Sequence, residues 1–356
     1  PGQRLVDQIA ARVVSGDMPP AAQPQPSAEA RRALVSWATC GDQTVDGPTP
    51  GGIDASAPLL EAPAEPPAGT EVFDLRPEGF PVPKREDHYE CFVFRAPVDE
   101  PRFMRRIDAI IDDTRVVHHL VLMRGGDDRE PGSSWECYML QDEVYAWAPG
   151  MGPLQFPEGG LRVEPGESFV LQVHYNNRAE HDTVDLSGVR VWHGPTEGPE
   201  IALLTLGNNN FQIPANSRAE VEGHCTLPDP IRVVASWPHM HEIGAGFDAY
   251  VVHADGTEQE LVRLRGWDFE AQFVYDTGMT LQAGDRLVTK CQFENPFDRR
   301  VGFGPDTGDE MCFNFLYHTP PLRWDYCNEP PPPDADEPYP AGACARGWRR
   351  WAERRA

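Results

Sequence analysis

The chain carries two histidines, His239 and His241, that are separated by one residue at the end of an apolar, strand-like run. Because alternate side chains of a β-strand share a face, both imidazoles can reach one metal ion. Met311, about seventy residues further on, offers a thioether, a soft ligand that favours copper, especially Cu(I), over zinc, calcium or magnesium. These residues therefore predict a copper site. The alternatives are two hydrogen-bonded polar histidines and a core methionine, and Met151 and Met279 offer competing thioethers.

A second set of histidines lies upstream, where His118 and His119 are consecutive. Adjacent side chains of a regular strand face opposite ways, so the two can bind one ion only at a strand end, at a bulge, or through different ring nitrogens. His174 stands in the run 169–175 and shares its strand face with Gln172, away from the expected core. Together the three histidines predict a second copper site, and two sites with different ligands indicate redox chemistry. The alternative is that these histidines are solvated surface residues.

The composition narrows the class of protein. A formal charge of −25 over 356 residues argues against nucleic-acid binding, which needs a basic surface. None of the eight cysteines stands in a C-x-x-C pair, so we expect disulfides and an extracytoplasmic protein, secreted or periplasmic, with buried thiols as the alternative. No apolar run reaches the roughly 18 residues of a membrane span. No signal peptide is visible, so we expect a mature or trimmed chain.

The elements that must position these histidines are short strands. The 37 prolines and 32 glycines mark frequent turns, and alternating apolar residues between them predict an all-β chain of two tandem β-sandwiches. We expect the first sandwich at 71–214 and the second at 215–328, where one strand is predicted near 269–274. Before them we expect a short helical N-terminal segment at 1–45 and a Pro/Gly/Ala linker at 46–70. A Pro-rich linker and basic tail occupy 329–356.

The histidines stand in a series of motifs that occurs in the same order in a known enzyme family. The motifs are His118-His119-Leu120, Tyr145-Ala146-Trp147-Ala148, 154–159 (LQFPEG), 171–175 (LQVHY), His239-Met240-His241 and Glu310-Met311-Cys312. Over about residues 73–327 the chain resembles the copper type II, ascorbate-dependent monooxygenases. That group includes peptidylglycine α-hydroxylating monooxygenase and dopamine β-monooxygenase.

The resemblance implies a role for each histidine set. In the first domain, His118, His119 and His174 would hold an electron-transfer copper. In the second, His239, His241 and Met311 would hold the catalytic, oxygen-binding copper. It further implies antiparallel jelly-roll-like sandwiches, two copper ions, and hydroxylation of a C–H bond in a small-molecule or peptide-like substrate by O₂.

The resemblance also implies a disulfide framework. Three pairs are expected: Cys91 with Cys137, Cys225 with Cys327, and Cys291 with Cys312. Cys40 and Cys344 remain, and arithmetic alone leaves them as a fourth pair between the N-terminal segment and the tail.

Three aromatic residues depart from the pattern of the peptide-amidating members. Trp237 stands where those enzymes have an arginine for the peptide carboxylate, and Phe313 and Phe315 replace an asparagine and a tyrosine. We therefore do not expect peptide amidation. The three side chains are candidates for an apolar substrate pocket, and the alternative is ordinary core packing.

The N-terminal segment resembles the end of a c-type cytochrome domain, with Met18 before two prolines and then Trp37 and Cys40. The C-x-x-C-H attachment motif is absent, so we expect no covalent haem in this chain. The resemblance implies a cytochrome as electron donor in place of ascorbate if the segment comes from a longer precursor. A short helical hairpin packed on the sandwich is the alternative.

Three functions remain open at this point. The leading hypothesis is a dicopper monooxygenase. The alternative is a copper-binding or electron-transfer protein on the same scaffold, without hydroxylase activity. The third is a double sandwich that binds carbohydrate or protein and whose histidines are incidental.

Overall fold

The computed structural model describes residues 54–84, 86–137, 142–148, 151–177, 182–269, 271–304, 308–323 and 326–328. The expected helical segment at 1–45, the tail at 329–356, Cys40 and Cys344 lie outside these ranges. The described chain divides into two compact units. Unit 1 contains the described residues up to Ile201 and the segment Leu264–Asp276, and unit 2 contains Ala202–Arg263 and the described residues from Thr277.

The regular elements of the described residues are all β-strands, which confirms the all-β prediction. None of the described chain forms a helix with the length and apolar character needed to cross a membrane. Most of the strand pairings among the described residues are antiparallel. Two short pairings are parallel: β10 (Gly160–Val163) with the first residues of β14 (Glu200–Gly207), and β14 with β24 (Tyr326–Asn328).

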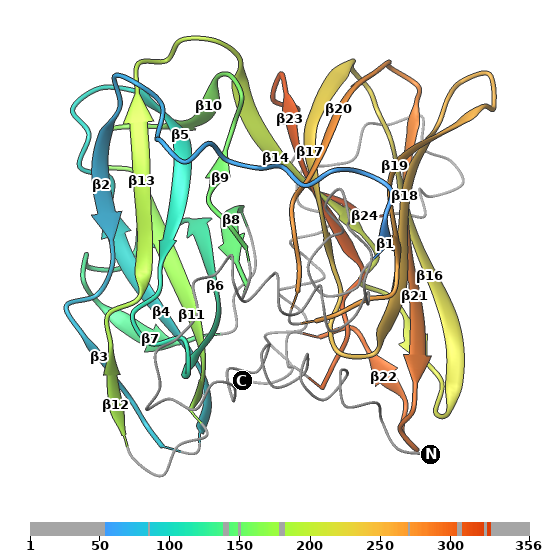
Figure 1. The fold of residues 1–356 in the computed structure, drawn as a ribbon, viewed down its shortest axis with the longest axis horizontal. Helices are drawn as coiled ribbons and strands as arrows, with labels where there is room; N and C mark the ends of the chain where they lie inside the picture. The colour runs from blue at the N-terminus through green and yellow to red at the C-terminus, as the bar shows by residue number, and fades with distance from the viewer. Residues whose placement is uncertain are drawn as a thin grey trace, which may run out of the picture. The chain divides into compact units, whose positions relative to one another are not determined.

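Unit 1 contains two main sheets (Figure 1). One has the order β7-β4-β11-β6-β8, formed by Ser134–Glu136, Glu86–Arg95, Ser168–Asn177, Val117–Arg124 and Glu143–Trp147. The other runs β2-β13-β5-β10, formed by Glu71–Leu75, Gly188–Gly194, Arg102–Ile110 and Gly160–Val163, and β9 (Leu154–Gln155) pairs with β5. A small two-stranded sheet joins β3 (Phe80–Val82) to β12 (Thr183–Asp185).

Strand β11 lies at the centre of its sheet and is buried on both faces. The apolar set Phe169, Leu171 and Val173 is fully buried, as the alternation predicts. The opposite face is buried too, because Gln172 and His174 are only 2% and 1% exposed. The expected solvated face of this strand is therefore a second packed surface, which places His174 inside the protein.

Unit 2 also contains two main sets of hydrogen-bonded strands. One has the order β19-β18-β21-β16, formed by Glu258–Arg265, Gly244–Val252, Arg286–Asn295 and Ser217–Thr226. The other runs β14-β23-β17-β20, formed by Glu200–Gly207, Phe313–Thr319, Ile231–His239 and Tyr275–Leu281, with β24 (Tyr326–Asn328) on β14. A third, two-stranded sheet joins β15 (Gln212–Ile213) to β22 (Val301–Gly302).

Close backbone approach and disulfides hold the sheets together. An added Cβ at Gly223 of β16 would overlap the carbonyl of Gly207 in β14, so the sheets meet there without side chains. The structure contains the three disulfides that the resemblance implied: Cys91–Cys137 in unit 1, and Cys225–Cys327 and Cys291–Cys312 in unit 2.

Two segments differ from the sequence pattern. Part of the expected linker is paired, because β1 (Asp54–Ala55) lies on the end of β19 and Leu59 forms an isolated bridge with Tyr275. The strand predicted near 269–274 is wrong, since the described residues there form no strand and β20 begins at Tyr275. This connection packs with unit 1 instead.

Candidate metal centres

The histidines of unit 1 are brought together by a β-bulge. His174 of β11 pairs with His119 of β6, but the next residue, Tyr175, pairs with Val117. His118 is therefore the extra residue of β6 at this register shift. A bulge redirects the side chains of the strand that carries it, so two consecutive histidines can turn toward one point. This is one of the arrangements that the sequence required for the pair to share an ion.

The three imidazoles converge through the same ring nitrogen. Nδ1 of His119 lies 3.2 Å from Nδ1 of His118 and 3.3 Å from Nδ1 of His174. Two nitrogens that each bind one ion at about 2.0–2.1 Å with tetrahedral angles are about 3.3 Å apart. A neutral imidazole carries one proton, so three facing Nδ1 atoms cannot all be matched by hydrogen bonds, whereas an ion accepts all three lone pairs. The donor set therefore fits a metal ion that favours imidazole, copper among them.

Two aromatic rings, of Tyr89 and Phe269, contact this histidine cluster. The Tyr89 ring of β4 stacks on His174 with centroids 4.0 Å apart and planes 6° apart. Phe269 contacts His118, with ring centroids 5.2 Å apart. Phe269 lies in the segment Leu264–Asp276, which belongs to unit 1. His174 is almost fully buried, while His118 and His119 are half-buried. The cluster thus lies at the edge of a packed region, with one buried and two more accessible candidate ligands.

The second pair of histidines stands at the end of β17. His239 is the last residue of that strand and His241 follows it by two, with ring centroids 5.3 Å apart. Met240 between them is completely buried. Nδ1 of His241 lies 3.1 Å from the carbonyl oxygen of Asp309. A carbonyl only accepts, so Nδ1 carries the proton and the lone pair of His241 is on Nε2.

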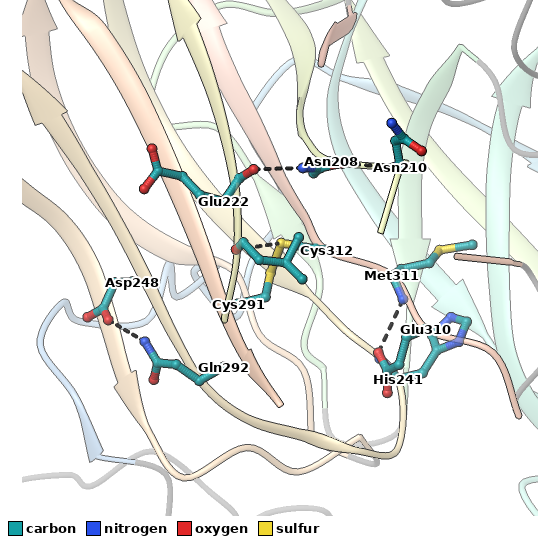
Figure 2. The surroundings of a disulfide bond; sticks show 11 residues. Asn208, Asn210, Glu222, His241, Asp248, Cys291, Gln292, Glu310, Met311 and Cys312 are labelled. Atoms are coloured by element: carbon teal, nitrogen blue, oxygen red, sulfur yellow. Dashed lines mark hydrogen bonds between the residues drawn. A yellow bond between two sulfur atoms is a disulfide. The ribbon is translucent and has the colours of Figure 1, made fainter. Parts of the chain in front are cut away.

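Glu310 binds the backbone of both His241 and Met311 (Figure 2). Oε2 of Glu310 accepts hydrogen bonds from the backbone N–H of His241 at 2.8 Å and of Met311 at 3.1 Å, and Oε1 accepts one from Ile243 at 2.8 Å. The Glu310 side chain is completely buried. Burial raises the pKa of its carboxyl to about 7, and the three N–H donors oppose that rise. The Met311 side chain is itself 1% exposed.

The three aromatic residues singled out in the sequence form a patch with His239. Trp237 and Phe315 are cross-strand partners whose rings stack at 4.8 Å, and Phe313 is the cross-strand partner of His239. The Trp237 and Phe315 rings each lie 6.0 Å from the His239 ring. All three aromatic side chains are at most 6% exposed. The patch is thus an apolar wall on the strand face that carries His239.

Sequence reasoning missed several residues at these sites. In the sequence Glu310 stands in the Glu310-Met311-Cys312 motif, and a stretch of polar residues does not predict that its side chain is buried. Asp309 contributes a backbone carbonyl, which no side-chain pattern reveals. Tyr89, two residues before Cys91, stands in no motif that marks it as a neighbour of the histidines. Phe269 comes from a connection that the pattern assigned to the other unit.

Residues 73–182 match the N-terminal domain of the copper type II ascorbate-dependent monooxygenases, and residues 200–340 match their C-terminal domain. The chain is 27% identical over 302 residues to DBH-like monooxygenase protein 1 of Gallus gallus, covering 73% of this chain and 49% of that protein. It is 31% identical over 269 residues to peptidyl-glycine alpha-amidating monooxygenase of Mus musculus, covering 69% and 26%. Dopamine beta-hydroxylase of Rattus norvegicus is 27% identical over 307 residues, covering 76% and 49%. The chain spans about half the length of the DBH-like relatives that it matches.

Proposed function

Since the chain belongs to the copper type II ascorbate-dependent monooxygenases, we propose that it is a dicopper enzyme that hydroxylates a C–H bond. In the overall reaction a substrate R–H, O₂, two electrons and two protons give R–OH and water. Copper bound at these sites supplies one-electron redox chemistry toward O₂, and the chain supplies ligands, orientation and substrate placement.

The convergence of three imidazoles in unit 1 is the observation that supports this proposal most strongly. We assign His118, His119 and His174 to the electron-transfer copper in the first sandwich, 71–214. Three neutral nitrogens suit an ion that changes between two oxidation states. The Tyr89 ring, stacked at 4.0 Å, keeps the buried His174 ring in one orientation.

We assign His239, His241 and Met311 to the catalytic copper in the second sandwich, 215–328. The hydrogen bond from His241 Nδ1 to the Asp309 carbonyl favours the tautomer that presents Nε2 to an ion. A thioether ligand stabilises Cu(I), the oxidation state that reacts with O₂. The buried position of Met311 keeps this weak ligand out of water.

The substrate that we propose is a small, largely apolar molecule, or a peptide-like one that is not held through a terminal carboxylate. Trp237, Phe313 and Phe315 lie on the strand face of His239 and carry no charge that could bind a carboxylate. Two of the relatives are named for peptidyl-glycine and dopamine. Peptide amidation is not proposed, because Trp237 stands at the position of the arginine expected for it.

The reductant and the compartment are part of the same proposal. Ascorbate is the reductant in the family's description, and a cytochrome is the second candidate because of the N-terminal resemblance. The three disulfides are compatible with an extracytoplasmic location, secreted or periplasmic.

Incorporation of labelled oxygen tests the proposal. Copper-loaded protein is supplied with ascorbate, ¹⁸O₂ and a panel of apolar and peptide-like substrates, and the products are analysed by mass spectrometry. The expected result is one ¹⁸O atom in the product, dependent on both copper and reductant. The competing function, electron transfer without hydroxylation, predicts reduction and reoxidation of bound copper with no labelled product from any substrate.

A further inference from the structure

Glu310 joins the two backbone segments that carry His241 and Met311. Its carboxylate accepts three backbone hydrogen bonds, two from the segment after β17 at His241 and Ile243, and one from Met311. The side chain is completely buried. A buried carboxylate is costly unless its oxygens are matched by donors, so this arrangement is built around the carboxylate rather than tolerating it.

The backbone of Glu310 is fixed as firmly as its side chain. Its N–H donates to the carbonyl of Gly302 at 2.9 Å and its carbonyl accepts from Gly304 at 3.2 Å. On one side of it, the Asp309 carbonyl orients His241 through Nδ1. On the other side, Cys312 is joined to Cys291 of β21. The segment 309–312 is therefore anchored at each residue, and Met311 is anchored through its backbone N–H on Glu310.

We propose that Glu310 is a positioning residue, which sets the Met311 thioether against His239 and His241 by binding the backbone of both segments. This inference rests on the proposed copper site and adds a determinant of its geometry. A thioether is a weak ligand, so its contribution depends on being held at bonding distance before the ion arrives. Residues that hold metal ligands in this way typically change metal affinity by about 10- to 100-fold when they are replaced.

The substitution Glu310→Gln separates this role from bulk and shape. Glutamine has the same size, but its amide nitrogen only donates and so cannot accept a bond from an N–H. If the amide oxygen faces His241 and Met311, the nitrogen opposes Ile243; in the flipped orientation it opposes His241 and Met311. Either way the segments lose part of their connection. The matched control is Asp285→Asn, another buried unit 2 carboxylate, which accepts the N–H of Gln282 at 2.8 Å.

The experiment measures Cu(I) affinity by competition with a chromophoric chelator, and sulfur scattering at the copper absorption edge, on reduced full-length protein. For Glu310→Gln we expect the weaker-bound copper to lose affinity by about 10- to 100-fold and the sulfur signal to fall. The three-histidine copper should keep its affinity. Asp285→Asn should behave like the wild type in both measurements.

If Glu310→Gln does not accumulate as folded protein, Glu310→Asp gives the same test, because a carboxylate shortened by one methylene cannot reach both segments. Two coppers and an unchanged sulfur signal in either variant would overturn the inference. An equal loss in Asp285→Asn would also overturn it, since the effect would then be general destabilisation. A wild-type protein that binds no second copper, or shows no sulfur, would instead overturn the proposed function.

Discussion

Acid should destabilise unit 2 through His318, which lies near the end of β23 between Ala202 of β14 and Val233 of β17. The side chain is 1% exposed, and its Nδ1 donates to the carbonyl of Pro320 at 3.1 Å. Within the described residues, its Nε2 has no hydrogen-bond partner. Burial therefore lowers the pKa of His318 from 6.5 to about 4.

The sign of the effect follows from which state takes up the proton first. Below pH 6.5 the unfolded chain protonates His318, whereas the folded chain does so only near pH 4. The unfolded state binds more protons between these values, so the free energy of unfolding falls as the pH falls. The loss is negligible at pH 7.5. At pH 4.5, two units below the ordinary pKa, it reaches about 2.5 kcal/mol at roughly 1.36 kcal/mol per unit.

Urea unfolding of copper-free protein at pH 7.5 and pH 4.5 measures this loss. His318→Gln keeps a donor for the Pro320 carbonyl but does not titrate, so its stability should fall by about 2.5 kcal/mol less than that of the wild type. His253→Gln is the control. The hydrogen bond to Asp285 raises the pKa of His253, so this histidine does not cause the loss of stability at acid pH. Replacing it should therefore leave the acid-induced loss from His318 in place. Equal losses in the wild type and His318→Gln would refute the reasoning.

Three further predictions concern the sites and the frame around them. His119→Ala removes the Nδ1 atom that lies within 3.3 Å of the Nδ1 atoms of His118 and His174. Copper analysis should therefore show about one ion fewer per chain and an unchanged second site. Loss of both ions would contradict this assignment. Replacing both Cys291 and Cys312 by serine opens a loop with a sequence separation of 21. This should lower the free energy of unfolding by about 3 kcal/mol, measured in urea under non-reducing conditions. An unchanged free energy of unfolding would contradict the prediction. Gly223→Ala should lower the melting temperature by several degrees, because the new Cβ meets the Gly207 carbonyl. Gly152→Ala, at an exposed position outside the strands, meets no atom nearby and is the control. Equal shifts in both variants would contradict the close approach.

The sequence identifies the proposed ligand residues, but it predicts less well how they come together. Alternation and turns were sufficient for an all-β chain, and consecutive His118 and His119 required a bulge or a strand end if both were ligands. The register shift opposite His174 supplies that bulge, but its position depends on how two strands pair, which a single strand's pattern does not contain. The burial of His174 was missed for a related reason, since β11 is central and both of its faces are covered.

The residues that contact the proposed ligands are the hardest to predict from the sequence. Glu310 is a charged residue in a polar stretch, and such residues are almost always exposed unless they are paired. Its three partners are backbone N–H groups, which every residue offers, so nothing in the side-chain pattern distinguishes them. Phe269 reaches His118 from a segment expected to be a strand of the second sandwich. Contacts of this kind depend on tertiary packing and not on local periodicity.

X-ray absorption at the copper edge of the reduced, copper-loaded protein tests the central claim most directly. Five imidazoles and one thioether shared by two ions predict about half a sulfur per copper, with nitrogen as the other ligand, and Met311→Leu should remove the sulfur and leave the nitrogen shell. A spectrum with no sulfur, or one that is unchanged in Met311→Leu, would contradict the assignment of His239, His241 and Met311 to one copper ion.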